Sequence, residues 1–314
     1  GIMRMAAKIS IVLSTYNGEK YIEQQLDSIR TQELEADEVL ISDDCSTDNT
    51  VKIIKKYIEK YNLDKWEITQ NEINKGWKQN FINGIENAKG EYIFTCDQDD
   101  IWYPSKVRVM TEKMTENSLI GVLVSDFDEF DERGIIKRKH RETGKIVKLK
   151  EEYCFMNVRF PGCVYCIRKE FYNEIKQYWK KDFPHDAFFW RFSMFAGKLY
   201  YLDSPTIRQR KHNDSTFTKE AIASKNLKSK LQELEYITET IAQLKYYVLN
   251  RNYDNDYRLK ILNEAERWNK KRRKFLNTHC FFTWFSLMRY IHVYATPKKY
   301  LLDLYLVIKA KRGK

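Results

Sequence analysis

The stretch Glu91-Tyr-Ile-Phe-Thr-Cys-Asp-Gln-Asp-Asp-Ile-Trp102 decides the fold of this chain. Its apolar run, Tyr92 to Cys96, predicts a buried strand, and three carboxylates, Asp97, Asp99 and Asp100, follow where that strand ends. Ligands of open α/β sheets collect at the carboxyl ends of the strands. Divalent cations are commonly held by carboxylates together with substrate phosphates, so this strand end is a candidate site for a metal and a diphosphate. Taken alone, the stretch also fits an acidic turn that caps the next helix.

The residues before this stretch predict a parallel sheet. Ile9 to Leu13, Val39 to Ser42 and Trp66 to Thr69 are short β-rich runs, and segments of helical period separate them. Strands that alternate with helices in this way indicate βαβ units. The carboxyl ends of parallel strands meet at one edge of the sheet. The sequence therefore predicts that three polar clusters converge on one crevice: Ser14-Thr15-Tyr16, Asp43-Asp44 and Asp97-Gln98-Asp99.

The chain contains none of the glycine-rich loops that cradle phosphates. Neither G-x-G-x-x-G nor G-x-x-x-x-G-K-[ST] occurs, which argues against a dinucleotide site and against a P-loop. Without such a loop, a bound diphosphate needs a cation to neutralise its charge. The acidic strand end after Cys96 can hold that cation.

Three motifs in this order resemble family 2 glycosyltransferases of the GT-A fold. They are Val12-Leu-Ser-Thr-Tyr-Asn-Gly-Glu19, Ser42-Asp-Asp-Cys-Ser-Thr-Asp48 and Asp97-Gln-Asp-Asp-Ile-Trp102, and the resemblance covers roughly residues 8–215. The last motif, together with Asn80-Phe81 and the pair His185-Asp186, is most similar to bacterial polysaccharide rhamnosyltransferases. The resemblance implies an α/β, Rossmann-like, mostly parallel sheet flanked by helices.

The resemblance also implies a donor site for a nucleoside-diphosphate sugar. A carboxylate at Asp44 would accept a hydrogen bond from the base N3–H, which favours uracil or thymine and hence a UDP- or dTDP-sugar such as dTDP-rhamnose or a UDP-hexose. Mg²⁺ or Mn²⁺ would bridge the two phosphates. The implied nucleotide-sugar-binding residues are Ser14, Thr15, Tyr16, Asp44, Asp97 and Gln98, and the implied metal ligands are Asp99 and His212. Asp100 and Trp102 fit capping and packing roles equally well.

The implied catalytic base is Asp186, in the segment Phe183-Pro-His-Asp-Ala-Phe-Phe-Trp-Arg191. An acceptor hydroxyl must lose its proton as it attacks the sugar, and a carboxylate in a partly apolar setting can take it. The alternative is a buried Asp that caps a helix. Rhamnosyltransferase relatives often carry two Trp after this Asp, where this chain has Ala187 and Phe188. Downstream, Arg208 and Arg210 are candidate phosphate partners.

Charge divides the chain into two predicted domains. Residues 1–218 contain 34 Lys and Arg against 35 Asp and Glu, whereas residues 219–314 contain 21 against 9, so the last third supplies the whole net charge of +11. We predict a glycosyltransferase domain over residues 1–218 and a basic, aromatic-rich helical domain over residues 219–314, because the periodicity after Lys219 is helical throughout.

The basic helical domain fits three kinds of contact. Cations in Lys270-Lys-Arg-Arg-Lys274 are followed by the aromatic segment Phe275 to Met288, a composition typical of helices that lie on an anionic membrane surface. That segment is too short to span a bilayer. A helical bundle packed on the first domain and a homodimer interface are the alternatives. No nucleic-acid-binding module is recognisable, so nucleic acid is not an expected partner.

These observations predict an inverting, metal-dependent glycosyltransferase. The expected acceptor is a glycan, free, lipid-linked or on a glycoprotein, in the synthesis of cell-surface polysaccharide or glycoconjugate. The competing class is a non-catalytic nucleotide-sugar-fold protein that acts as a membrane-docked assembly partner. No secretory pattern is present and the six cysteines lack paired spacing, so we expect a cytoplasmic protein with reduced thiols, peripheral at the inner face of the cell membrane.

Overall fold

The computed structural model describes residues 8–131, 133–134, 136–137, 142–150, 152–211, 226–251 and 255–312. Its strands form one ten-stranded sheet in the order β3-β2-β1-β4-β9-β6-β10-β5, with β7 added beside β6 and β8 beside β10. The strands are β1 (Ile9–Thr15), β2 (Glu38–Asp43), β3 (Trp66–Gln70), β4 (Tyr92–Cys96), β5 (Ile101–Trp102), β6 (Val122–Phe130), β7 (Ile136–Lys137), β8 (Ile146–Lys148), β9 (Tyr165–Arg168) and β10 (Leu199–Arg210).

The predicted parallel sheet is present, with antiparallel strands added to it. Strands β1 to β4 pair in parallel, and β6 pairs in parallel with β10. Between these two groups lies β9, which runs antiparallel to both β4 and β6. Since β4 and β6 are both antiparallel to β9, they run in the same direction as each other, and β10 runs parallel to β6. All six long strands therefore end at one edge of the sheet.

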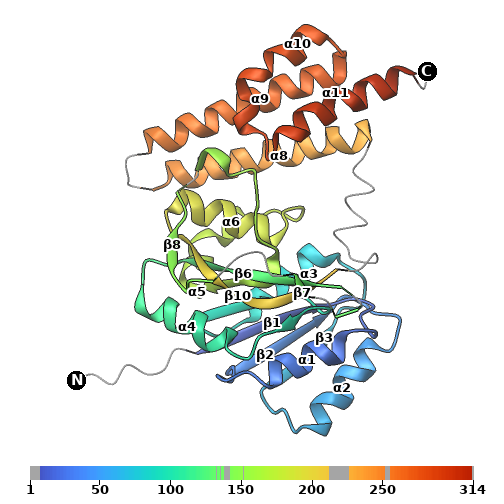
Figure 1. The fold of residues 1–314 in the computed structure, drawn as a ribbon, viewed down its shortest axis with the longest axis vertical. Coiled ribbons are helices and arrows are strands. Elements are labelled where there is room, and N and C mark those ends of the chain that lie inside the picture. Colours follow the sequence, from blue (N-terminus) through green and yellow to red (C-terminus); the bar gives the residue numbers. More distant parts are fainter. Residues whose placement is uncertain are drawn as a thin grey trace.

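Helices cover both faces of the sheet (Figure 1). On one face lie α1 (Ile22–Arg30), α2 (Thr50–Lys60) and α4 (Lys106–Glu116), and on the other lie α3 (Trp77–Asn87), α5 (Lys169–Ile175) and α6 (His185–Ala196). Glycine permits one close contact, since a Cβ at Gly84 of α3 would come within 2.5 Å of the Val12 side chain of β1. This layered arrangement is the predicted α/β fold.

The last part of the chain is an α-helical extension that stands on the α6 side of the sheet (Figure 1). It contains α8 (Leu227–Leu249), α9 (Asp256–Thr278), α10 (Phe281–Ser286) and α11 (Pro297–Arg312). The ring of Tyr247 packs 5.4 Å from that of Phe192 in α6 and 5.3 Å from that of Tyr178. One continuous hydrophobic core runs from the sheet into these helices. No helix among the described residues is both long and apolar enough to cross a bilayer.

Candidate active site

The three polar clusters predicted to converge lie at adjacent strand ends. In the parallel register, Leu13 of β1 lies opposite Cys96 of β4, and Thr15 of β1 lies opposite Asp43 of β2. The segments that follow these strands, Tyr16 onward, Asp44 onward and Asp97 onward, therefore leave the sheet side by side. This edge is where an open α/β sheet places its ligands.

A buried amide joins the first two clusters. Asn80 of α3 donates to the Ser14 Oγ at 2.7 Å and to the Ser42 backbone carbonyl at 2.6 Å, and its Oδ1 accepts from the Ser42 hydroxyl at 2.6 Å. Asn71 donates to the same Oδ1 at 3.0 Å. Asn80 is fully buried, so it fixes the ends of β1 and β2 relative to α3. Ser14 is accordingly engaged inside the protein in this structure.

Asp44 is buried and holds the loop after β3. Its carboxylate accepts backbone hydrogen bonds from Lys75 and Gly76, each at 2.8 Å, and a side-chain bond from Asn71 at 2.9 Å. Gly76 has a φ of +85°, which a residue with a Cβ adopts only at a cost. The loop thus wraps around Asp44, and its predicted contact with a nucleobase stays a prediction.

Tyr16 and Gln98 form a clamp between β1 and the acidic segment. The Gln98 amide accepts from the Tyr16 backbone N–H at 2.9 Å and donates to the Tyr16 carbonyl at 3.0 Å. A Cβ at Gly18 would come within 2.3 Å of the Gln98 Oε1, so a side chain at this position would displace the Gln98 amide. The Tyr16 ring itself is 46% exposed. Gln98 therefore positions the strand end, while the Tyr16 ring is available to stack on a base.

The acidic segment gathers two carboxylates around a thiol. One ligand atom each from Asp97, Asp100 and Cys163 lies within 4.8 Å of the others. Burial, then Asp100 and Asp99, raise the pKa of the Asp97 carboxyl well above its usual range, although this side chain is only half-buried. Burial, then Asp99, raise the pKa of Asp100 to about 7. These carboxylates repel one another in this structure.

This group fits a divalent cation through its carboxylates. The Oδ2 of Asp100 is buried and has no hydrogen-bond partner among the described residues, and mutual repulsion of carboxylates is what a cation relieves. The thiol fits less well, because Mg²⁺ and Mn²⁺ prefer oxygen and burial raises the pKa of Cys163. Asp99 as a metal ligand stays a prediction. His212 lies outside the described residues.

Arg210 holds the acidic segment in place. Its backbone N–H donates to Asp100 at 3.0 Å, its Nε donates to the Asp99 carbonyl at 2.9 Å, and its guanidinium donates to Gln24 at 2.6 Å. The same guanidinium lies 4.3 Å from the Tyr21 ring centroid. The backbone N–H, the Nε and one Nη of Arg210 are thus bound to the protein in this structure, and its predicted contact with a phosphate stays a prediction.

A second positioning residue, Lys106, was missed from the sequence. It begins α4 and is fully buried, with its ammonium 3.1 Å from the Thr206 hydroxyl and 3.3 Å from the Cys163 carbonyl. Its ammonium also lies 4.7 Å from the Trp102 ring centroid. Burial lowers the pKa of Lys106 to about 8, opposed by nearby thiols and Asp100. No sequence signal separates this lysine from the many exposed ones, because its burial depends on distant strands.

Asp186 comes to the same crevice from the first turn of α6. The residue before it, His185, packs against Gly162, and the Gly162 carbonyl accepts a hydrogen bond from the Thr95 hydroxyl of β4, so this turn of α6 lies beside β4. The Oδ1 of Asp186 accepts from the Ala187 backbone N–H at 2.7 Å, as a residue near a helix start does. The neighbouring His185 is buried and stacks 3.9 Å from the Phe81 ring, and burial lowers its pKa, so its imidazole is neutral at pH 7. Asp186 as the base stays a prediction.

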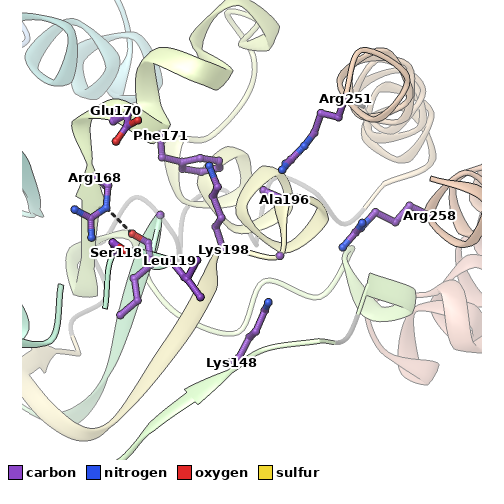
Figure 2. A pocket seen from close by; sticks show the side chains of 13 residues that line it. Ser118, Leu119, Lys148, Arg168, Glu170, Phe171, Ala196, Lys198, Arg251 and Arg258 are labelled. Carbon is purple, nitrogen blue, oxygen red and sulfur yellow. Dashed lines mark hydrogen bonds between the residues drawn. The ribbon is translucent and has the colours of Figure 1, made fainter. Parts of the chain in front are cut away.

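A cavity of about 630 Å³ lies at the opposite edge of the sheet (Figure 2). Cations line it near the end of α6, but they have structural partners: Lys198 pairs with Glu174 at 2.7 Å, and Arg168 donates to the Ile120 carbonyl at 2.8 Å. Cations beside a helix carboxyl end are stabilising in themselves. This cavity is therefore separate from the strand ends that carry the candidate site.

Comparison with solved structures defines the class of protein. The fold is similar to Staphylococcus aureus TarS 1–349 in complex with UDP-GlcNAc (TM-score 0.64, 19% identity, 98% of this chain and 92% of that one). It is also similar to the mannosyltransferase PcManGT from Pyrobaculum calidifontis in complex with GDP-Man and Mn²⁺ (TM-score 0.55, 12% identity, 97% and 85%). The molecule therefore has the GT-A fold of nucleotide-sugar glycosyltransferases.

Sequence comparison then gives the family. The model of glycosyl transferase family 2 matches residues 10–199. The dTDP-rhamnosyl transferase RfbG of Shigella flexneri is 30% identical over 220 residues, which cover 65% of this chain and 72% of RfbG. The chain belongs to glycosyl transferase family 2, as its motifs predicted. It is 27% identical to TarS over 284 residues, which cover 83% of this chain but only 48% of TarS. The match to the putative glycosyltransferase EpsE of Bacillus subtilis likewise covers 48% of that protein.

Proposed function

We propose that this protein is an inverting glycosyltransferase that moves a sugar from a nucleoside diphosphate to a hydroxyl of a bacterial glycan acceptor. The observation that carries the proposal is that the strand ends before Tyr16, Asp44 and the acidic segment 97–100 lie side by side, with the first turn of α6, which contains Asp186, packed beside β4. A donor with a nucleobase, a diphosphate and a sugar needs contacts of these kinds in this order along a crevice.

The donor we propose is a UDP- or dTDP-sugar. The exposed Tyr16 ring would stack on the pyrimidine, and Asp44 would accept its N3–H. Ser14 and Thr15 would support this pocket from the end of β1, where both are buried. The names of two relatives support the choice, since RfbG is a dTDP-rhamnosyl transferase and TarS has been solved with UDP-GlcNAc.

Asp99, with Asp97 and Asp100, would hold Mg²⁺ or Mn²⁺. When bound, such a cation neutralises negative charge on a diphosphate. The similarity to PcManGT, solved with Mn²⁺, supports a metal at this strand end. Gln98 and Arg210 would keep the acidic segment in position, because Gln98 ties it to the Tyr16 backbone and Arg210 donates to the Asp99 carbonyl within it.

Asp186 would act as the general base. It takes the proton of the acceptor hydroxyl while that oxygen bonds to the anomeric carbon, and the bond from this carbon to the diphosphate oxygen breaks on the opposite side. One displacement of this kind inverts the anomeric configuration. A positioned general base contributes about 10²- to 10⁴-fold to the rate.

Two measurements test this function. Wild-type protein incubated with Mn²⁺ and a panel of nucleotide sugars should hydrolyse or transfer from one of them. Asp186→Asn should bind that donor normally but transfer about 10³-fold more slowly. Asp182→Asn, an exposed residue just before α6, is the matched control and should keep wild-type turnover. Turnover by Asp186→Asn within threefold of wild type would refute the base, and no turnover of any donor would favour the non-catalytic class.

We also propose that the C-terminal helices hold the enzyme at an anionic membrane surface, peripheral at the cytoplasmic face. Residues 219–314, which contain these helices, carry all of the net positive charge of the chain. Each Lys or Arg near an anionic surface contributes about 1 kcal/mol to binding. The enzyme would then reach glycan acceptors whose lipid carriers are embedded in that membrane.

A further inference from the structure

The short helix α10 exposes apolar side chains in a way that ordinary folding does not explain. Phe281, Phe282, Phe285 and Met288 are all exposed, and Phe282 reaches 87%. None of the six residues of α10 is buried. Burying one such side chain in an apolar environment is worth roughly 2–3 kcal/mol, so this ridge leaves substantial free energy unused in the isolated chain. We call these four residues the aromatic ridge.

The orientation of the ridge is fixed by the bundle. Trp284 stacks 4.6 Å from the Tyr300 ring of α11 with an interplanar angle of 9°, and its Nε1 donates to the Tyr300 carbonyl at 3.4 Å. Trp284 therefore attaches α10 to α11, while Phe282 stays almost fully exposed. Figure 1 shows α10 at the end of the molecule far from the sheet, so a surface that covers α10 leaves the candidate active site accessible.

A cationic groove lies directly beside the ridge. It has a volume of about 580 Å³ and is lined on the α9 side by Arg267, Lys270, Lys271 and Lys274. These positions are spaced by three and four residues, so they form one stripe on the helix. The other wall carries Phe282, Thr283, Ser286 and Tyr290, and the Ser286 hydroxyl donates to the Thr283 carbonyl at 2.7 Å. We call this hollow the α9–α10 groove.

The cations of the groove are poorly neutralised. Within the part of the chain that the structure describes, Glu266 pairs with Lys270 at 3.2 Å and is shared with Lys245, and no carboxylate pairs with Arg267, Lys271 or Lys274. Lys271 lies 5.6 Å from the Tyr290 ring centroid, which directs its stem along the groove wall. By contrast, the adjacent Arg272 points into the bundle and pairs with Asp303.

From this combination we infer that the α9–α10 groove binds the phosphate of a single anionic phospholipid headgroup while the aromatic ridge enters the acyl region above it. Three cations without a carboxylate partner among the described residues match the negative charge of a phosphate diester. The ridge matches the glycerol and acyl carbons attached to that phosphate, which a free phosphate ion lacks. The inference deepens the proposed membrane docking and rests on it.

The experiment compares vesicle binding of full-length variants by sedimentation. One set of vesicles contains phosphatidylcholine with about 30% phosphatidylglycerol, which makes the surface anionic. The other set contains phosphatidylcholine alone. Lys271→Gln/Lys274→Gln removes two groove cations, and Lys55→Gln/Lys56→Gln removes two exposed cations from α2 as the matched control. The groove pair should weaken binding to the anionic vesicles about 25-fold, at about fivefold for each cation. The control should change it less than about threefold, since surface charges beyond a Debye length are screened.

A second pair of variants tests the ridge. Phe282→Ala should weaken binding to anionic vesicles about tenfold, whereas Leu249→Ala, at an exposed apolar position on α8, should leave it unchanged. Short-chain phosphatidylglycerol below its micelle concentration should bind wild type at one saturable site and lose this site in the groove pair. Inorganic phosphate should compete only weakly.

Several results would overturn the inference. Equal loss of binding in the groove and control pairs would mean that only overall charge matters. Equal binding of inorganic phosphate and short-chain lipid, with no effect of Phe282→Ala, would mean a free-anion site. Donor turnover is measured on the same proteins and should be unchanged in the groove pair. Failure of wild type to turn over any donor refutes the proposed transferase and leaves the vesicle result standing, while failure of wild type to bind vesicles refutes the docking itself.

Discussion

At the scale of single residues, the candidate site rests on side chains that bind other parts of the protein. Asn80, Gln98 and Arg210 each hold a strand end or loop by two or more hydrogen bonds. Preorganised sites need such supporting groups, because misplacement of a reacting group by about 1 Å can cost 10²-fold in rate. The sequence pattern singled out Gln98 and Arg210 as candidate ligand contacts and Asn80 as part of a motif, but it did not reveal their hydrogen bonds to the strand ends.

Asn80 provides the test at this scale. Asn80→Ala should lower the free energy of unfolding by about 3 kcal/mol, because it leaves the buried Ser14 and Ser42 groups without their partner. Urea denaturation followed by circular dichroism measures the change. Asn87→Ala, an exposed position at the end of the same helix, should cost less than about 0.5 kcal/mol. Equal losses in the two variants would contradict the supporting role of Asn80.

At the scale of elements, helix α9 directs the consecutive cations of residues 270–274 into different environments, a surface groove and the interior of the bundle. Lys270, Lys271 and Lys274 face the α9–α10 groove, while Arg272 is buried. Its guanidinium donates to both carboxylate oxygens of Asp303 at 2.6 and 2.8 Å and lies 3.3 Å from Glu233. Asp303 comes from α11 and Glu233 from α8, so this one arginine ties three helices together.

Neighbouring arginines in α9 give a matched comparison. Arg272→Ala should destabilise the protein by about 3–5 kcal/mol, because it leaves Asp303 charged and unpaired in the interior. Arg273→Ala should cost less than about 1 kcal/mol, since its pair with Glu235 at 3.7 Å is exposed to solvent. Thermal unfolding of both variants measures the difference. A small effect for Arg272→Ala would show that the bundle does not depend on this ion pair.

At the scale of the whole molecule, the predicted division at residue 218 marks a change in composition more than a break in packing. Helix α8 packs on α6 through Tyr247, Phe192 and Tyr178, and the Tyr247 hydroxyl donates to Glu174 at 2.6 Å. The base candidate Asp186 lies in the first turn of that same α6. The helical extension therefore supports the helix that carries the proposed chemistry.

Two adjacent tyrosines test this coupling. Tyr247→Ala, at a position only 2% exposed, should destabilise the sheet and the bundle together by about 4 kcal/mol, in one transition seen by both circular dichroism and tryptophan fluorescence. Tyr246→Ala, at a position 58% exposed, should cost less than about 1 kcal/mol. Two separated transitions in the wild-type protein would show that the bundle folds independently.

The amino-acid sequence by itself determined the alternation of strands and helices, the polar strand ends, the family and the basic last third. These features depend on local periodicity and on motifs, which are contiguous in the chain. Only the tertiary structure decided that Gln98 clamps Tyr16, that Arg210 and Lys106 serve the acidic segment, and that Arg272 turns inward while Lys271 and Lys274 turn outward. The physical reason is that partners for these side chains come from elements 30 to more than 100 residues away in sequence, and a charge pattern does not reveal which charges are buried until those elements pack.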